Sequence, residues 1–140
     1  MLYFGQELFL RAQKNGTLAS PAYTKALHKC RRLSRDLGID AVMAKHRLDA
    51  LVAPTGNPAW PTDLVNGDHF TGGSSTPAAV AGYPSVSVPM GFAFGLPVNL
   101  SFFGRAWSEP TLIKFAYAYE QGSKHRKAPD FAASVTFPPA

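Results

Sequence analysis

The sequence contains a single cysteine, Cys30, among its 140 residues, so no disulfide can form within the chain. A fold that depended on an oxidising compartment would need at least one pair of cysteines. No run of about 18 apolar residues occurs, which is the length that a membrane-spanning helix requires. Met1 is not followed by the basic segment and apolar core of a signal peptide. These absences predict a cytoplasmic protein without a membrane partner.

Sequence motifs for common ligands are missing as well. The chain contains neither Gly-x-Gly-x-x-Gly nor Gly-x-x-x-x-Gly-Lys-Ser/Thr, the patterns that cradle nucleotide phosphates. Its histidines lack the i, i+4 spacing of a helical metal pair, and no cysteine cluster accompanies them. They are His28, His46, His69 and His125. We therefore expect neither a cofactor nor a metal ion.

The net charge of +5 raises the question of a nucleic-acid partner. Such a partner requires positive residues that gather with aromatic residues or glycines on one surface. Here the positive residues lie along one predicted helix, between residues 25 and 35, and in a short tract at 124–127. Solvated faces account for both groups better than phosphate binding does. The sequence therefore predicts no nucleic-acid partner.

The composition is that of a packed globular protein, with 46% hydrophobic and 16% charged residues. A helix is expected over 5–14, closed by Asn15-Gly16, and a second begins with Ser20 as N-cap and Pro21 at the first helical position. The second helix should end at Gly38 and bury one apolar stripe. The stripe consists of Tyr23, Leu27, Cys30, Leu33 and Leu37. Its spacing predicts that Cys30 is a core residue rather than a nucleophile.

The rest of the chain is predicted to form strands, a long loop and short helices. The expected elements are a short helix over 39–46, a strand over 49–54 that Pro54 ends, a Pro/Gly-rich loop over 55–73, a helix over 76–82 with Pro77 at its first position, a hairpin of 85–90 and 97–103, and a helix over 108–122. This order predicts an α/β fold, a mixed sheet flanked by helices with a hairpin and a closing C-terminal helix. So small a sheet has exposed edges, which indicates a piece of a larger sheet or a dimer.

Gly72-Gly-Ser-Ser75 is the foremost candidate for a catalytic site. A glycine-rich turn that presents a serine can place backbone N–H groups around a developing oxyanion. A serine nucleophile also needs a base, for which His69, Lys45 and Asp68 are the candidates. The alternative interpretation, a flexible loop that caps the next helix, is favoured. Asp68-His69 is the best pair for acid/base chemistry or for anchoring a ligand. A turn-stabilising aspartate beside a surface histidine explains this pair equally well.

Four segments carry a family resemblance. They are Asp49–Thr55, Ala81–Gly91, Gly95–Gly104 and Trp107–Leu112 leading to Tyr119-Glu120. In this order they resemble the C-terminal part of the amidase signature family. The resemblance implies hydrolysis of a carboxamide through an acyl-enzyme, in which a serine attacks, a second serine with a cis peptide bond relays the proton and a lysine accepts it. It places all three residues in an N-terminal half that this sequence does not contain.

The resemblance therefore implies no catalytic residue in this chain, which by itself is expected to be inactive. Gly72–Ser75 stands just before the Gly82-Tyr-Pro84 strand lead, where the family does not keep its nucleophile. Asp68-His69-Phe70-Thr71 resembles an Asp-x-Phe-Thr stretch that helps to bind the amide substrate in the transamidating members of the family. We expect one domain or fragment, with a helical lead (1–48), strands and a substrate-side loop (49–104), and a C-terminal helix and tail (105–140).

Three hypotheses follow for function and partners. In the first, the chain is a C-terminal fragment of an amidohydrolase that acts on a small-molecule amide and needs the missing N-terminal half. In the second, it is a non-catalytic binding or assembly module that pairs with a second copy through its sheet edges. In the third, it is a self-contained serine hydrolase that uses Ser74 or Ser75 with His69.

Overall fold

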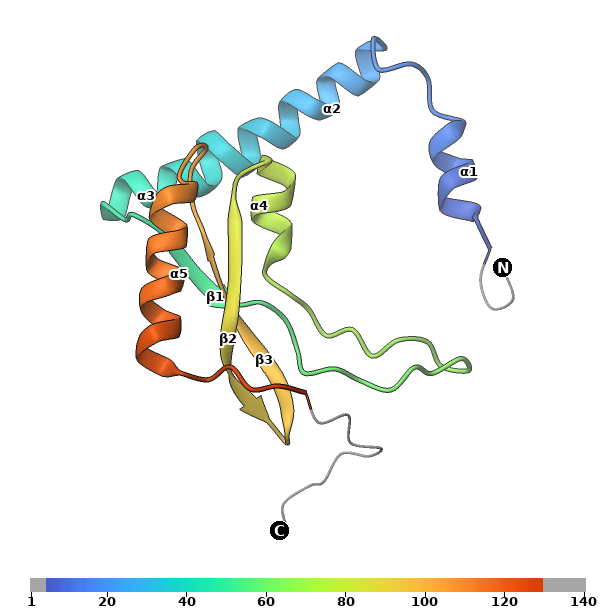
Figure 1. Cartoon of the computed structure of the whole chain (residues 1–140). Helices are drawn as coiled ribbons and strands as arrows, with labels where there is room; N and C mark the ends of the chain where they lie inside the picture. Colours follow the sequence, from blue (N-terminus) through green and yellow to red (C-terminus); the bar gives the residue numbers. More distant parts are fainter. Residues whose placement is uncertain (1–4, 130–140) are drawn as a thin grey trace.

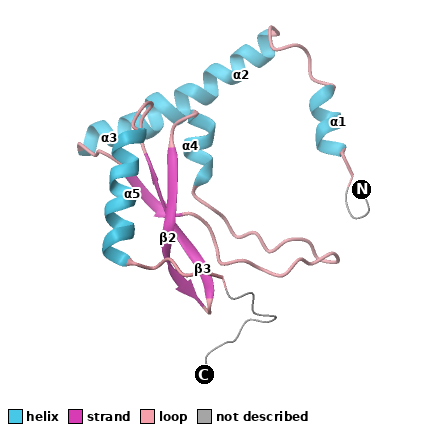
Figure 2. Ribbon diagram, viewed as in Figure 1, coloured by secondary structure: helices cyan, strands magenta, loops and turns pink. Residues whose placement is uncertain are grey.

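The computed structural model describes residues 5–129, in which helices pack against a three-stranded sheet (Figure 1). The elements are, in chain order, α1 (Glu7–Gln13), α2 (Pro21–Arg31), η1 (Arg32–Ile39), α3 (Asp40–His46), β1 (Leu51–Pro54), α4 (Ser75–Ala81), β2 (Ser85–Ala93), β3 (Leu96–Phe103) and α5 (Glu109–Ser123). The long connection between β1 and α4 stands out as a loop in Figure 2. The expected helices, hairpin and closing helix are confirmed.

The helical lead begins as its sequence predicts and bends at Gly38. Ser20 Oγ accepts a hydrogen bond of 3.3 Å from the Tyr23 N–H, and Pro21 occupies the first helical position. Helices α2, η1 and α3 then run on from one another, with non-helical dihedral angles at Gly38 (φ −108°, ψ −109°). A Cβ at this position would lie 2.7 Å from the carbonyl oxygen of Leu33, so the bend requires a glycine.

The predicted burial of the α2 stripe is wrong for the part of the chain that the structure describes. Helix α2 has no buried residue, Cys30 is exposed, and Leu33 and Leu37 on η1 are 48% and 59% exposed. Figure 1 shows that α1 and the N-terminal part of α2 extend away from the sheet, whereas α4 lies against the other end of the helical lead. The periodicity marks an apolar face, but a partner for that face has to come from tertiary structure.

Strand β3 is the centre of the sheet, and its neighbours β1 and β2 both run antiparallel to it. Leu51 and Ser85 are both paired with Phe103, one from each side. The hairpin strands are longer than predicted and are joined by Phe94 and Gly95, whose φ angles of 54° and 80° suit a tight turn. Among residues 5–129, β1 and β2 each have one unpaired edge.

Two hydrophobic clusters form on opposite faces of the sheet, and neighbouring residues of β3 belong to different clusters. Phe103 packs with the η1–α3 and α4 side, and Phe102 packs with α5. Successive side chains of a strand point to opposite faces, which explains this division. The cluster around Phe103 contains Ile39, Met43, Ala78 and Ala81, and the cluster around Phe102 contains Val88, Leu112 and Ala116.

Helix α4 lies close against this framework because its buried residues are small. Ala78 and Ala81 are buried, and Arg35 Nε donates a hydrogen bond of 2.6 Å to the Ala81 carbonyl oxygen. The helix begins at Ser75, so the prediction that Pro77 is its first residue is wrong. Gly82 ends the helix as predicted, with a left-handed φ of 65°. Helix α4 thereby fixes the position of the segment that precedes it.

Candidate functional site

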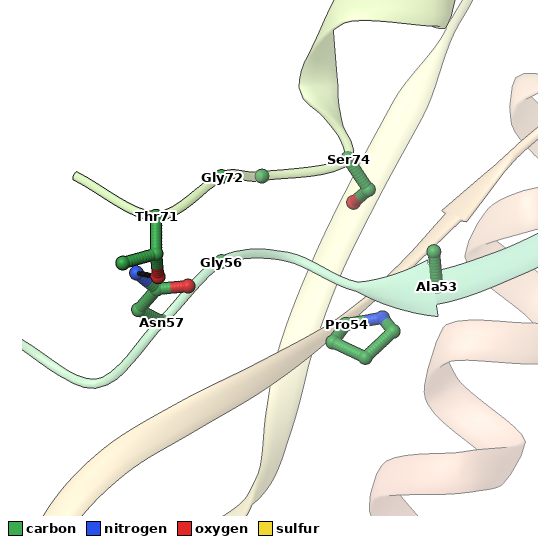
Figure 3. Close-up of a pocket in the computed structure, with 8 residues that line it drawn as sticks. Ala53, Pro54, Gly56, Asn57, Thr71, Gly72 and Ser74 are labelled. Atoms are coloured by element: carbon green, nitrogen blue, oxygen red, sulfur yellow. Dashed lines mark hydrogen bonds between the residues drawn. The ribbon is translucent and has the colours of Figure 1, made fainter.

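A shallow pocket of about 350 Å³, wide open to solvent, lies where β1 runs into the long loop and where that loop returns to α4 (Figure 3). It is lined by Ala53, Pro54, Gly56, Asn57, Thr71, Gly72, Gly73 and Ser74. The two groups of lining residues are distant in sequence, and both limbs of the loop contribute to the pocket. None of the lining residues carries an ionisable side chain, so the pocket suits an uncharged ligand.

Thr55 holds the base of the pocket through both its backbone and its side chain. Its N–H donates a hydrogen bond of 2.8 Å to the carbonyl oxygen of Asn99, and its carbonyl accepts one of 3.1 Å from the Ser74 N–H. Its Oγ1 is hydrogen-bonded to Ser101 Oγ at 2.8 Å and to Ser87 Oγ at 2.7 Å. Thr55 therefore links the loop to both strands of the hairpin and to the start of α4.

A β-bridge and a side-chain hydrogen bond join the two limbs of the loop at 55–73. Gly56 and Gly73 form a β-bridge, and a Cβ on Gly73 would lie 3.1 Å from the Thr55 carbonyl oxygen. Asn57 Nδ2 donates a hydrogen bond to Thr71 Oγ1 (Figure 3). This bond leaves Asn57 Oδ1 as an acceptor and the Thr71 hydroxyl as a donor. The pair thus presents one donor and one acceptor beside the pocket.

The serines of Gly72–Ser75 are not paired with a base. Ser74 Oγ is buried and has no hydrogen-bond partner among the described residues, and Ser75 is exposed. Ser74 is the N-cap of α4, but its side chain caps no backbone N–H. Pro77 occupies the third helical position, where an N-cap oxygen usually finds a donor, and proline has none. No hydrogen bond between described residues joins either serine to His69.

Only one of the four expected substrate-side residues lines the pocket. Thr71 lines it, whereas Asp68, His69 and Phe70 are exposed on the loop beyond it. The structure adds Asn57, which the sequence patterns did not single out. A polar residue placed shortly after the end of a predicted strand was the available signal.

Asp63 is an acidic residue of the same loop, and it serves the turn at the loop's tip. Its Oδ1 accepts hydrogen bonds of 2.9 Å from the N–H groups of Val65 and Asn66. The bonds from Asn66, followed by the bond from Val65, lower the pKa of the Asp63 carboxyl below its ordinary value. The ionised Asp63 carboxylate is thus stabilised by the hydrogen bonds that it accepts within this turn.

Residues 5–129 contain no helix that is both long and apolar enough to cross a membrane. Within the same range, no group of three or more His, Cys, Asp or Glu side chains is arranged to hold a metal ion.

Comparison with known proteins identifies the family. The sequence profile described as Amidase matches residues 3–113, and the chain therefore belongs to the amidase family. A probable amidase of Arabidopsis thaliana is 37% identical over 131 residues, which cover 93% of this chain and 22% of that protein. A glutamyl-tRNA(Gln) amidotransferase component of Symbiobacterium thermophilum is 33% identical, with coverage of 89% of this chain and 27% of that protein.

Solved structures agree with this assignment. A peptide amidase in complex with the competitive inhibitor chymostatin is 56% identical, with a TM-score of 0.88 and coverage of 92% of this chain and 26% of that one. The native peptide amidase of Stenotrophomonas maltophilia is 55% identical, with a TM-score of 0.83 and coverage of 91% and 26%. The chain thus spans about a quarter of the length of its relatives.

Proposed function

We propose that this chain is the C-terminal part of an amidohydrolase that cleaves carboxamide bonds through an acyl-enzyme. The serine, the cis-bonded serine and the lysine of this chemistry lie outside the chain. The observation that carries the proposal is a family match to about a quarter of each relative, in a chain whose pocket serine, Ser74, has no hydrogen-bonded base within the described residues. In this proposal the chain supplies part of the sheet and core and one wall of the substrate cavity.

The chemistry of the pocket supports an amide as the ligand. A carboxamide is neutral and carries both a hydrogen-bond donor and an acceptor, which matches the uncharged lining and the Asn57–Thr71 pair. Two of the similar solved structures are peptide amidases, and we extend a peptide-like amide substrate to this chain on that basis. Asp68, His69, Phe70 and Thr71 remain our proposed substrate-side residues, of which Thr71 lies nearest the pocket.

An assembly surface is favoured by a separate observation. Tyr23, Leu33 and Leu37 expose apolar surface along α2 and η1, and the strands β1 and β2 each keep an unpaired edge among the described residues. Such surface in a folded chain marks an interaction site. We propose that the remaining three quarters of the amidase fold cover it, and that in their absence a second copy does so.

The test is a chimera in which this chain replaces the matching segment of the Stenotrophomonas maltophilia peptide amidase. We expect the chimera to hydrolyse peptide amides and the chain alone to be inactive. A folded chimera without hydrolytic activity would contradict the proposal.

A second measurement locates the nucleophile. The chain alone, incubated with a fluorophosphonate that marks activated serines, should show no change in intact mass, whereas the chimera should be labelled once. Labelling of Ser74 or Ser75 in the chain alone would establish a self-contained hydrolase instead.

A further inference from the structure

Two aromatic side chains stand beside the pocket on opposite limbs of the loop. The ring centroids of Trp60 and Phe70 are 6.0 Å apart, with their planes inclined at 57°. Phe70 Cζ lies 3.9 Å from the position that a Cβ on the pocket residue Gly73 would take. Phe70 therefore lies at the edge of the pocket beside Gly73, and Trp60 contacts it from the opposite limb of the loop.

The ring pair leaves much of its apolar surface uncovered. Phe70 is 67% exposed, although it contacts Trp60, and Trp60 is only half-buried. Covering the exposed surface is favourable in proportion to its area, and aromatic rings add a preference for other rings. An apolar group of a ligand seated in the pocket is in position to provide this cover.

We propose that Trp60 and Phe70 form an aromatic lip that selects uncharged amides with an apolar or aromatic side chain next to the carboxamide. This inference rests on the proposed amide-hydrolysing function and adds the substrate class to it. The carboxamide is held by the Asn57–Thr71 pair while the neighbouring side chain covers Phe70. The lining residues offer no cation to a carboxylate, so the corresponding free acid is held less well.

The experiment is an NMR titration of the ¹⁵N-labelled chimera, with its nucleophilic serine replaced by alanine, with N-acetylphenylalaninamide, N-acetylglycinamide and N-acetylphenylalanine. We expect the phenylalanine amide to shift the signals of Thr71, Gly72 and the Trp60 indole. It should bind about tenfold more tightly than the glycine amide, the size of effect expected for one covered ring. The free acid should bind more weakly than its amide.

Two variants test the lip itself. Phe70→Ala should remove most of the preference for the phenylalanine amide, and Phe70→Leu should keep part of it. Phe9→Ala is the matched control, because Phe9 is 73% exposed on α1, away from the pocket-lining residues. The same variants in the active chimera, compared by kcat/KM on the two amides, measure the preference during catalysis as well as in binding.

The outcomes separate the lip from the proposed function. Equal affinity for the two amides, an unchanged preference in Phe70→Ala, or tighter binding of the free acid would overturn the lip and leave an amide site in place. If neither amide shifts any signal between residues 53 and 74 and the chimera is inactive, the lip and the proposed function are both wrong. An active chimera that shows no preference contradicts the lip alone.

Discussion

Thr55 Oγ1 and Ser101 Oγ are hydrogen-bonded at 2.8 Å, and Ser101 is only 5% exposed. The contact joins the residue that follows β1 to the central strand β3 at the base of the pocket. A buried hydroxyl that loses its partner is destabilising, because it has given up its hydrogen bonds to water. The Thr55 side chain therefore contributes to holding the long loop against the sheet.

Replacing Thr55 by valine, which has the same shape but no hydroxyl group, tests the contribution of this hydrogen bond to stability. Thr55→Val should lower the free energy of unfolding by about 1–3 kcal/mol, since it leaves Ser101 without its partner and also breaks the bond to Ser87. Urea denaturation measures this change. Thr62→Val, on the exposed part of the same loop, is the matched control and should change stability little. Equal effects of the two substitutions would show that the hydroxyl cluster is unimportant.

Two glycine substitutions should have opposite effects on stability, one at the bend of the helical lead and one inside α5. Gly38→Ala should destabilise the protein by about 1–3 kcal/mol, because its Cβ would lie 2.7 Å from the Leu33 carbonyl oxygen. Gly122→Ala, inside α5 with open space around the new Cβ, should stabilise it by about 0.5–1 kcal/mol through helix propensity. Thermal denaturation of both variants checks the signs. A neutral Gly38→Ala would mean that the bend straightens without cost.

The proposed role of Asp68 predicts an effect on substrate binding. In the chimera, Asp68→Ala should raise KM about tenfold or more, because a hydrogen bond from substrate to a charged acceptor is lost, while kcat changes less. Steady-state kinetics on a peptide amide separate the two constants. Asp36→Ala, which removes an exposed carboxylate on η1, is the control. An unchanged KM would remove Asp68 from the substrate site.

The uncovered apolar surface predicts self-association. The isolated chain should dimerise, aggregate or unfold readily, and sedimentation velocity over a range of concentrations measures which of these occurs. Leu33→Lys together with Leu37→Lys should weaken association, because both side chains are exposed on η1. Lys114→Gln, on an exposed position of α5, is the control. A stable monomer at all concentrations would contradict the proposed assembly surface.

The raised pKa of Tyr83 predicts that the folded protein loses stability in alkaline solution. Burial, followed by the hydrogen bond of 2.7 Å that its hydroxyl donates to Asp40 Oδ2, raises the pKa of Tyr83 above its ordinary value of about 10.0. The folded protein then holds this proton more tightly than the unfolded chain, so the contribution is complete below about pH 10 and decreases as the pH rises further. Tyr83→Phe should lose this part of the pH dependence in denaturant titrations between pH 9 and 11. An identical slope in the wild type and the variant would contradict the assignment.

Much of the fold could be predicted because its signals are local. Ser20 and Pro21 start a helix through contacts within one turn, and Gly82 ends α4 with a backbone conformation that glycine adopts easily. The start of α4 was misplaced because both Ser75 and Pro77 are compatible with a first turn, and sequence alone does not decide between them.

The elements, their order and the family resemblance could be predicted from the amino-acid sequence, because they depend on neighbouring residues and on motifs. The pocket could not, since it is formed by tertiary contacts in which Thr55 meets Ser87 and Ser101 across 32 and 46 residues of chain. The tertiary structure also decided that the stripe of α2 and η1 stays exposed, because an apolar face is buried only when another element lies against it.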